Sequence, residues 1–355
     1  MDIHILCFSA GGEELARKLQ NKLLAFYRVV SLASARKDCE GIARAGLSEW
    51  TEAHFRHGNA LVFVGSCGIA VRGIAPFVAD KAQDPAVLVI DEKGRFVIPL
   101  LSGHIGGANA LARKIAPLTG GTAVLTTATD VQDLLAIDVL ATENGLHISD
   151  MALAKAFSSR LLATGKAALY IPPTVKEEII IEGLPPPELE LRYAPIEAIP
   201  PNDSRAISCI SPFAEKSAIL NLIPPCLVLG IGCRKGKSPD ELAAFVGENL
   251  AALKLSPFAV RQIASVDVKR DEAGLIALAE RYRAAFTTFS AEVLRVVPGD
   301  FASSAFVERS VGVDNVCERA AVAAGAERLL LGKTVRDGMT LAIGIAKYRI
   351  TMGEQ

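Results

Sequence analysis

The sequence has little that would direct it to a membrane, to nucleic acid or to an oxidising compartment. Its formal net charge is −1 and aromatic residues make up only 6% of its 355 residues, so neither a positive field nor an aromatic pattern favours these partners. No apolar run reaches the roughly 18–20 residues of a spanning helix, and the N-terminus lacks the basic start of a signal peptide. Seven scattered cysteines without a C-x-x-C pair argue against disulfides and against a zinc site. These absences predict a cytoplasmic protein with no metal site of its own.

The sequence is rich in apolar residues, which make up 50% of the chain and can form a large core. Apolar runs alternate with segments of helical periodicity, and short glycine-bearing loops join them. This alternation predicts the α/β class, with two layered α/β domains and a smaller α/β middle domain or insertion. Proline pairs punctuate the middle section, and from them we place the domains at residues 1–135, 136–225 and 226–355.

Two glycine-bearing loops follow apolar runs in the first domain, GSCG (Gly65–Gly68) and LSGHIGG (Leu101–Gly107). Each loop opens a segment of helical periodicity, and the first N–H groups of a helix lack partners, so each loop suits an anion. The segment TTATD (Thr126–Asp130) also follows a predicted strand. Sites in open α/β sheets gather beyond the carboxyl ends of strands, and all three segments fall at such ends.

His104 and the residues of GSCG are the candidates for chemistry in these loops. His104 lies among glycines that offer its ring little shelter, and an ordinary histidine pKa near 6.5 suits proton transfer. A lone histidine can equally be structural, and both interpretations stay open. Ser66 does not fit a hydrolase elbow, because Val64 stands where that motif needs glycine. A binding role for the GSCG backbone is therefore favoured over a covalent role for Ser66 or Cys67.

A third glycine loop, GIGCRKGKSPDEL (Gly230–Leu242), opens the last domain. Ser238 and Glu241 have the spacing of a capping box. Only three residues separate Gly232 from Gly236, one fewer than a triphosphate loop needs. The loop instead combines a helix start with three cations, which suits carboxylates or phosphates, although an ordinary solvated loop remains an alternative. The cations are Arg234, Lys235 and Lys237.

Five separated motifs together resemble one known family. They are VGSCGIAVRGIAP, PLLSGHIGGANALA, TTATD, LGIGCRKG and LLLGKTVRDGMTLAIG, in that order. They are similar to the cobalt-precorrin-5A hydrolases of the oxygen-independent cobalamin pathway, and the match covers the first and last domains. The resemblance implies a cobalt tetrapyrrole substrate whose δ-lactone is opened by water, after which a two-carbon fragment leaves as acetaldehyde and cobalt-precorrin-5B remains. It also implies no cofactor beyond the cobalt of the substrate, with neighbouring pathway enzymes as candidate partners.

Under this resemblance the loops acquire roles in lactone hydrolysis. We assign His104 as base or proton shuttle, and Ser66 and Ser102, with the GSCG amides, as contacts to the lactone oxygens, where backbone donors would stabilise an oxyanion. We expect the substrate to lie between the first and last domains. The expected substrate-binding residues are Gly65, Cys67, Gly68, Gly103, Gly106, Gly107, Asn109, Gly232, Cys233, Arg234, Lys235, Lys237 and Lys333.

Two competing functions remain open. A non-catalytic tetrapyrrole-binding or channelling protein of the same pathway would need the cations but no acid–base residue. A nucleotide-dependent enzyme would rest on incomplete glycine motifs at Ser9–Gly12 and Gly230–Ser238. The first of these motifs lacks the G-x-G-x-x-G spacing, which favours a plain tight turn from strand to helix.

Overall fold

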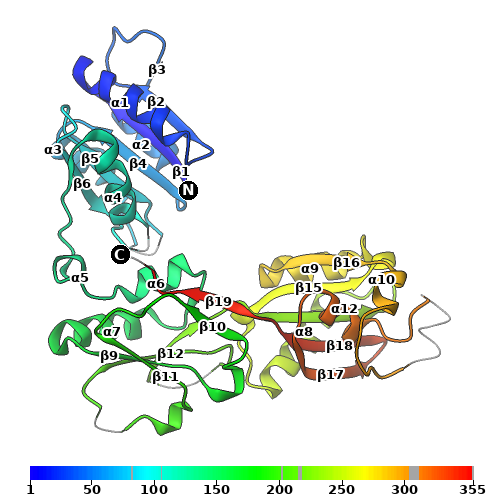
Figure 1. Ribbon diagram of the computed structural model, residues 1–355. Helices are drawn as coiled ribbons and strands as arrows, with labels where there is room; N and C mark the ends of the chain where they lie inside the picture. The colour runs from blue at the N-terminus through cyan, green and yellow to red at the C-terminus, as the bar shows by residue number, and fades with distance from the viewer. Residues whose placement is uncertain (81–82, 105, 201–202, 215–217, 304–311, 354–355) are drawn as a thin grey trace. The chain divides into compact units, whose positions relative to one another are not determined.

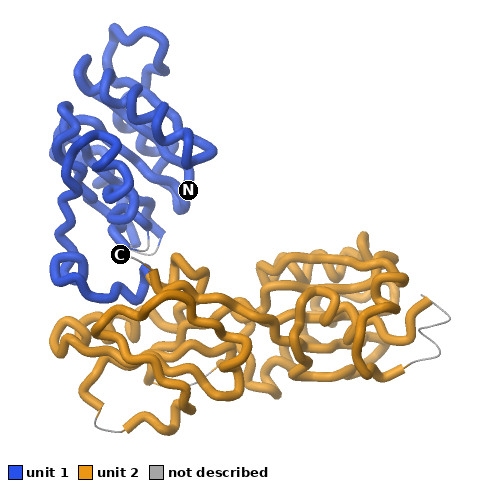
Figure 2. Tube along the Cα trace, in the orientation of Figure 1, with its two compact units in different colours: residues 1–139 blue, residues 140–355 orange. Residues whose placement is uncertain are grey.

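The computed structural model describes residues 1–80, 83–104, 106–200, 203–214, 218–303 and 312–353. The chain divides into two compact units, Met1–Val139 and Leu140–Gln355 (Figure 2). Both units combine helices with largely parallel sheets (Figure 1), so the predicted α/β class is confirmed. No helix within the described ranges is long and apolar enough to span a bilayer.

The first unit is built on one seven-stranded sheet, in the order β3-β2-β1-β4-β5-β6-β7. Strands β1 to β5 run parallel to one another, whereas β6 is antiparallel to β5 and β7 is parallel to β6. The elements from the start of the chain are β1 (Asp2–Cys7), α1 (Ala10–Leu23), β2 (Val30–Ser34), β3 (Ala43–Arg44), α2 (Leu47–His54), β4 (Asn59–Val64), α3 (Cys67–Ile74), β5 (Ala86–Ile90), β6 (Phe96–Leu101), α4 (Ala108–Thr119), β7 (Thr122–Ala123), α5 (Ala128–Val131) and α6 (Ile137–Glu143).

Both faces of this sheet are covered by helices, because alternate residues of a strand point to opposite faces. On one face Ile5 packs in a cluster with Leu19 of α1 and Leu111 of α4. On the other face Phe63 packs with Trp50 of α2 and residues of α3. The result is a three-layer unit with a layer of helices on each face of the sheet.

The direction of β6 separates two loops that we expected to act on the same lactone. Gly65–Gly68 follows β4, at the edge where the parallel strands end. Leu101 pairs with Val87 at the start of β5, so the segment that follows β6 lies at the opposite edge. The five residues of β5 span about 16 Å. The joint placement of Ser66 and His104 on one lactone is therefore wrong, and the cause is the reversed strand.

The second unit contains a five-stranded sheet in the order β11-β9-β12-β13-β8, another in the order β16-β15-β14-β18-β17, and the pair β10-β19. Its elements up to the middle of the unit are β8 (His147–Ile148), α7 (Met151–Thr164), β9 (Ala167–Tyr170), η1 (Pro173–Val175), β10 (Ile179–Glu182), β11 (Leu189–Arg192), η2 (Ile196–Ala198), β12 (Ala206–Ile210) and β13 (Leu220–Ile223). The remaining ones are β14 (Leu227–Cys233), α8 (Pro239–Ala252), η3 (Pro257–Ala259), β15 (Val260–Val266), η4 (Asp267–Lys269), α9 (Ala273–Tyr282), β16 (Ala285–Phe289), α10 (Ala291–Arg295), α12 (Cys317–Ala323), β17 (Arg328–Arg336), β18 (Met339–Ile345) and β19 (Tyr348–Thr351).

Local sequence signals explain several elements of this unit. The predicted capping box is present, because the Ser238 hydroxyl accepts from Glu241 N–H and the Glu241 carboxylate accepts from Ser238 N–H. The segment LLLGKTVRDGMTLAIG forms a hairpin of β17 and β18, which pair antiparallel. A Cβ on Gly230 would lie 1.8 Å from the carbonyl oxygen of Cys317, so glycine is what lets α12 pack against β14. The final strand β19 pairs with β10, which ties the end of the chain to the middle section.

Candidate active site

The loop that carries His104 folds back on the start of α4. Ala108 N–H donates to Ser102 O at 3.1 Å, Asn109 N–H donates to Gly103 O at 2.9 Å, and Gly107 N–H donates to His104 O at 2.9 Å. Three of the backbone donors expected to bind an anion are therefore used inside the loop. The prediction that the backbone N–H groups of Gly107 and Asn109 bind an anion is therefore wrong, because both groups already donate to carbonyl oxygens of the same loop.

The glycines of the loop have a steric role. A Cβ on Gly103 would lie 2.7 Å from Asn109 Oδ1, and one on Gly106 would lie 2.3 Å from Ser102 Cβ. Ser102 adopts a left-handed backbone with φ 53°, and its buried hydroxyl donates to the Asp84 carbonyl oxygen at 2.9 Å. A side chain at Gly103 or Gly106 would therefore clash with neighbouring atoms of the loop, and the Ser102 hydroxyl already has a hydrogen-bond partner.

The His104 ring lies between two carboxylates. Its Nε2 is 3.0 Å from Asp130 Oδ2, and its Nδ1 is 3.3 Å from Asp138 Oδ2. The three side chains are only 8–12% exposed. The expectation of an unsheltered ring is wrong, because the segment around α5 and the start of α6 cover it. The arrangement places both ring nitrogens within reach of a proton acceptor.

The two carboxylates control the charge of His104. The hydrogen bond with Asp138, followed by its charge and the contact with Asp130, raises the pKa of His104 despite the opposing effect of burial. Burial alone would raise the pKa of Asp130, but hydrogen bonds from Thr127 and His104 and the charge of Arg113 together lower it. The site therefore favours an imidazolium next to an ionised Asp130.

Asp130 is the centre of the polar contacts around the histidine. It accepts from Asn109 Nδ2 at 2.7 Å, from Arg113 Nη2 at 2.8 Å and from the Thr127 hydroxyl. Asn109, which we predicted as a substrate contact, therefore holds Asp130. Asp130 is the last residue of the TTATD segment, but neither Asp130 nor Asp138 is among the predicted site residues. The TTATD motif was a usable signal for Asp130, whereas no pattern in the sequence pointed to Asp138.

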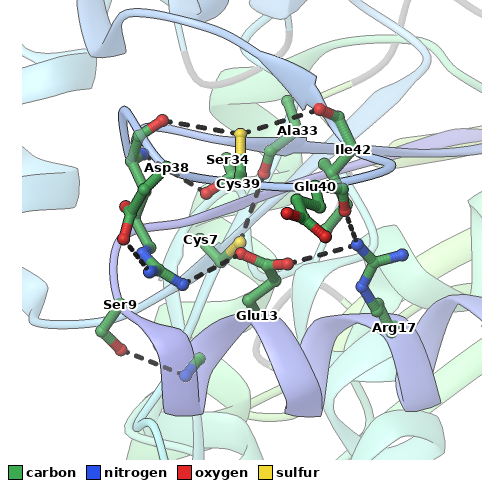
Figure 3. A network of polar contacts seen from close by, with 12 residues as sticks. Cys7, Ser9, Glu13, Arg17, Ala33, Ser34, Asp38, Cys39, Glu40 and Ile42 are labelled. Atoms are coloured by element: carbon green, nitrogen blue, oxygen red, sulfur yellow. Dashed lines mark hydrogen bonds and ion pairs between the residues drawn. The ribbon is translucent and has the colours of Figure 1, made fainter.

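The residues of GSCG lie at the opposite edge of the sheet. Ser66 is exposed and is the N-cap of α3, but its side chain makes no capping hydrogen bond. Cys67 is half-buried. The same edge carries the Ser9–Gly12 turn, in which the Ser9 hydroxyl accepts from Gly12 N–H at 3.1 Å (Figure 3). That segment thus forms a tight turn from β1 to the start of α1, with Ser9 as the N-cap.

A polar network fills the neighbouring surface of this edge (Figure 3). The Glu13 carboxylate accepts from Arg17 at 3.2 Å and from Arg36 at 3.3 Å. The thiols of Cys7 and Cys39 donate to backbone carbonyls. The contacts of Glu13 and Arg17 join α1 to the segment that follows β2.

The cationic loop of the last domain is partly neutralised by its own acidic neighbours. Gly236 N–H donates to Glu272 Oε1 at 2.8 Å, and Lys237 Nζ lies 2.7 Å from Glu241 Oε1. Arg234 and Lys235 are exposed, and within the described residues neither forms an ion pair. The structure thus leaves two of the three predicted cations of this loop available to an anion.

The other predicted residues of this region lie close to the same edge of the sheet. A Cβ on Gly232 would lie 2.6 Å from Thr340 Oγ1, and burial raises the pKa of the Cys233 thiol. Lys333 donates its backbone N–H to Glu318 Oε1 at 2.8 Å. In the described part of the chain, no group of three or more His, Cys, Asp or Glu side chains is placed to hold a metal ion.

Comparison with known proteins shows which family has this organisation. Residues 49–130 match the family model Cobalamin synthesis G N-terminal, and residues 227–344 match Cobalamin synthesis G C-terminus. The chain is 38% identical to the cobalt-precorrin-5A hydrolase of Salmonella typhimurium, over 97% of both chains. It is 30% identical to the protein of the same name from Priestia megaterium, over 83% of this chain and 80% of that one. The chain thus belongs to the cobalt-precorrin-5A hydrolase family.

Proposed function

We propose that this chain is a hydrolase that opens the δ-lactone of cobalt-precorrin-5A and releases acetaldehyde to give cobalt-precorrin-5B. The observation that carries the proposal is the His104 ring held between Asp130 and Asp138 at the end of a glycine loop. His104 and Asp130 lie inside the segment that matches the N-terminal family model. A non-catalytic carrier would not need a titratable triad of this kind.

The triad can move the protons that the reaction requires. Water that attacks the lactone must lose a proton, and the departing alcohol oxygen must gain one. Asp130 and Asp138 each lie within 3.3 Å of a ring nitrogen, so a proton accepted by one carboxylate can pass through the His104 ring. The structure favours the proton-shuttle role of His104 over that of a simple base, since neither ring nitrogen is free.

The same residues serve the second step. The hydroxyl of the two-carbon fragment loses its proton, its C–O bond becomes the carbonyl of acetaldehyde, and the carbon–carbon bond breaks. The electron pair of that bond stays on the macrocycle, which then takes up a proton. One group that accepts and one that returns a proton therefore suffice for both steps, and no oxidant or reductant is consumed.

Peripheral carboxylates of the substrate require cations. Arg234 and Lys235 are our candidates because both are exposed and carry no ion pair within the described residues, while Lys237 and Lys333 are weaker ones. We expect no cofactor besides the cobalt that the substrate carries. All seven cysteines are free thiols, which supports a reducing compartment such as the cytoplasm.

Acetaldehyde release from the lactone substrate tests the proposal. We expect His104→Ala to lower the rate by about 10²–10⁴-fold, the range typical of a lost acid–base group. His57→Ala is the matched control, because His57 is exposed and lies outside the triad. Wild-type protein that binds the substrate and releases no acetaldehyde would instead show a carrier, and a fully active His104→Ala would remove the triad from the mechanism.

A further inference from the structure

An open cleft of about 1390 Å³ lies in the second unit, where the middle section faces the side of α8 and the end of α9. Backbone contacts hold its two walls together, since Ala214 N–H donates to Lys254 O at 2.6 Å and Ser256 N–H donates to Pro212 O at 2.8 Å. Ordinary small-molecule sites measure roughly 300–1,000 Å³. The cleft is therefore large enough for a ligand much bulkier than a nucleotide or an amino acid.

The lining combines apolar surface with positive charge. Pro173, Ile196 and Leu250 contribute apolar wall, and Phe258 lies in the cleft with 56% of its surface exposed. The Phe258 ring is stacked on His147, with centroids 3.6 Å apart and planes inclined by 12°. This flat, braced aromatic face suits a planar or nearly planar ligand.

Cations on the ends of two helices surround this surface. They are Lys254 after α8, and Arg281 and Arg283 at the end of α9. Arg281 is 3.4 Å from Asp240, whereas Lys254 and Arg283 form no ion pair within the described residues. Glu197 is the carboxylate among the lining residues. Positive charge therefore exceeds negative charge around the cleft.

Lys254 and Arg283 share an unusual backbone conformation. Their φ angles are 54° and 53°, the left-handed region in which helices usually end with glycine. A side chain there carries a conformational cost, and such positions concentrate at ligand sites. Two neighbouring helices thus place a cation, in a position that favours glycine, beside the same cleft. Cations are also favoured at the carbonyl end of a helix by the helix dipole, so an experiment must distinguish ligand binding from helix stabilisation.

We propose that this cleft is a holding site for a tetrapyrrole macrocycle that carries several carboxylates. The ring would lie along Phe258 and the apolar wall, and the carboxylates would pair with Lys254 and Arg283. The ligand class rests on the proposed function, but the site is separate from the Arg234–Lys235 loop. That loop precedes α8, whereas Lys254 follows the helix at its other end, about 21 Å away for a helix of 14 residues.

Binding of cobyrinic acid, a cobalt corrin with free carboxylates, to the full-length chain tests the site. Calorimetry gives the dissociation constant, and cobinamide, whose corresponding carboxylates are amidated, is the matched ligand. We expect cobyrinic acid to bind more tightly than cobinamide, and the Lys254→Gly/Arg283→Gly pair to weaken its binding by at least about tenfold, as expected for lost charged contacts. Glycine adopts a positive φ without steric strain, so the melting temperature of the variant should stay the same or rise.

Two further variants sharpen the result. Phe258→Ala should weaken both ligands, while Lys155→Ala, at an exposed lysine of α7 that does not line the cleft, should leave cobyrinic acid binding unchanged. The proposal is overturned if wild-type protein does not bind cobyrinic acid, if cobinamide binds equally well, or if the glycine pair binds as wild type does. Acetaldehyde release by the wild-type protein separates the two claims, because a hydrolase with an irrelevant cleft would still release acetaldehyde.

Discussion

His104 Nδ1 lies 3.3 Å from Asp138 Oδ2, and both side chains are almost completely removed from solvent. The contact joins the glycine loop after β6 to the first turn of α6. Because Asp138 is the largest cause of the raised pKa of His104, the contact contributes to stability mainly when the imidazole is protonated. The contribution is complete below the ordinary pKa of about 6.5 and is lost as the pH rises through the raised value.

Asp138→Asn should therefore destabilise the chain in a pH-dependent way. We expect a loss of about 1–3 kcal/mol in the free energy of unfolding at low pH, the range of a hydrogen bond to a charged group, and a smaller loss in alkaline buffer. Urea denaturation at several pH values measures the difference, and NMR titration of His104 should show a lowered pKa. An equal loss at every pH would mean that the pair acts only through packing.

Asp130 should be needed to position His104 as well as to accept protons. Asp130→Asn removes the acceptor shared by His104, Asn109 and Arg113, and we expect a fall in the turnover number of about 10²-fold or more. Because the fold lowers the pKa of Asp130, the ionised carboxylate also stabilises the folded chain above about pH 4, and this stabilisation is lost as the pH falls. Asp133→Asn is the control, because Asp133 is exposed, and asparagine tolerates its left-handed backbone.

The informative result is a difference in turnover number between the Asp130→Asn variant and the Asp133→Asn control. If the two variants keep the same turnover number, the hydrogen bonds around Asp130 only stabilise the loop. If Asp130→Asn shifts the acid limb of the pH–rate profile, the carboxylate takes part in setting the charge of His104.

The two edges of the seven-stranded sheet should differ in their contribution to the reaction. Ser66 and Cys67 lie at the edge of the sheet away from His104. We therefore expect the Ser66→Ala and Cys67→Ala variants to release acetaldehyde within about threefold of the wild-type rate, whereas loss of an acid–base group lowers the rate by orders of magnitude. Steady-state assays of both variants beside His104→Ala provide the comparison. A large fall in turnover number for Ser66→Ala, with unchanged thermal stability, would return the chemistry to the GSCG edge.

Gly230 should tolerate no side chain. Its Cβ would meet the backbone oxygen of Cys317 at 1.8 Å, and backbone cannot rotate away as a side chain can. We expect Gly230→Ala to cost about 3 kcal/mol in the free energy of unfolding. Gly247→Ala in α8 is the control, since its Cβ meets nothing within 4 Å and alanine should stabilise the helix by about 0.5–1 kcal/mol. Equal melting temperatures for the two variants would contradict the close packing of α12.

The loop between β5 and β6 contains a signal for the direction of β6. Only five residues separate Ile90 from Phe96, and parallel strands need a crossover of a dozen or more residues. Gly94 N–H donates to Asp91 O at 2.7 Å, and this turn reverses the chain, so that β6 carries His104 to the opposite edge of the sheet. Asp138 had no such signal, because its contact with His104 spans 34 positions and depends on how the segment after β7 folds back.

The sequence by itself determined the α/β class, the glycine turns, the capping box of Ser238 and Glu241, and the closing hairpin. These features depend on residues a few positions apart, so their energetics are local. Only the tertiary structure decided which loops share an edge and which carboxylates face His104. Strand direction and long-range pairing depend on the packing of the whole sheet, and a linear pattern of residues does not contain that packing.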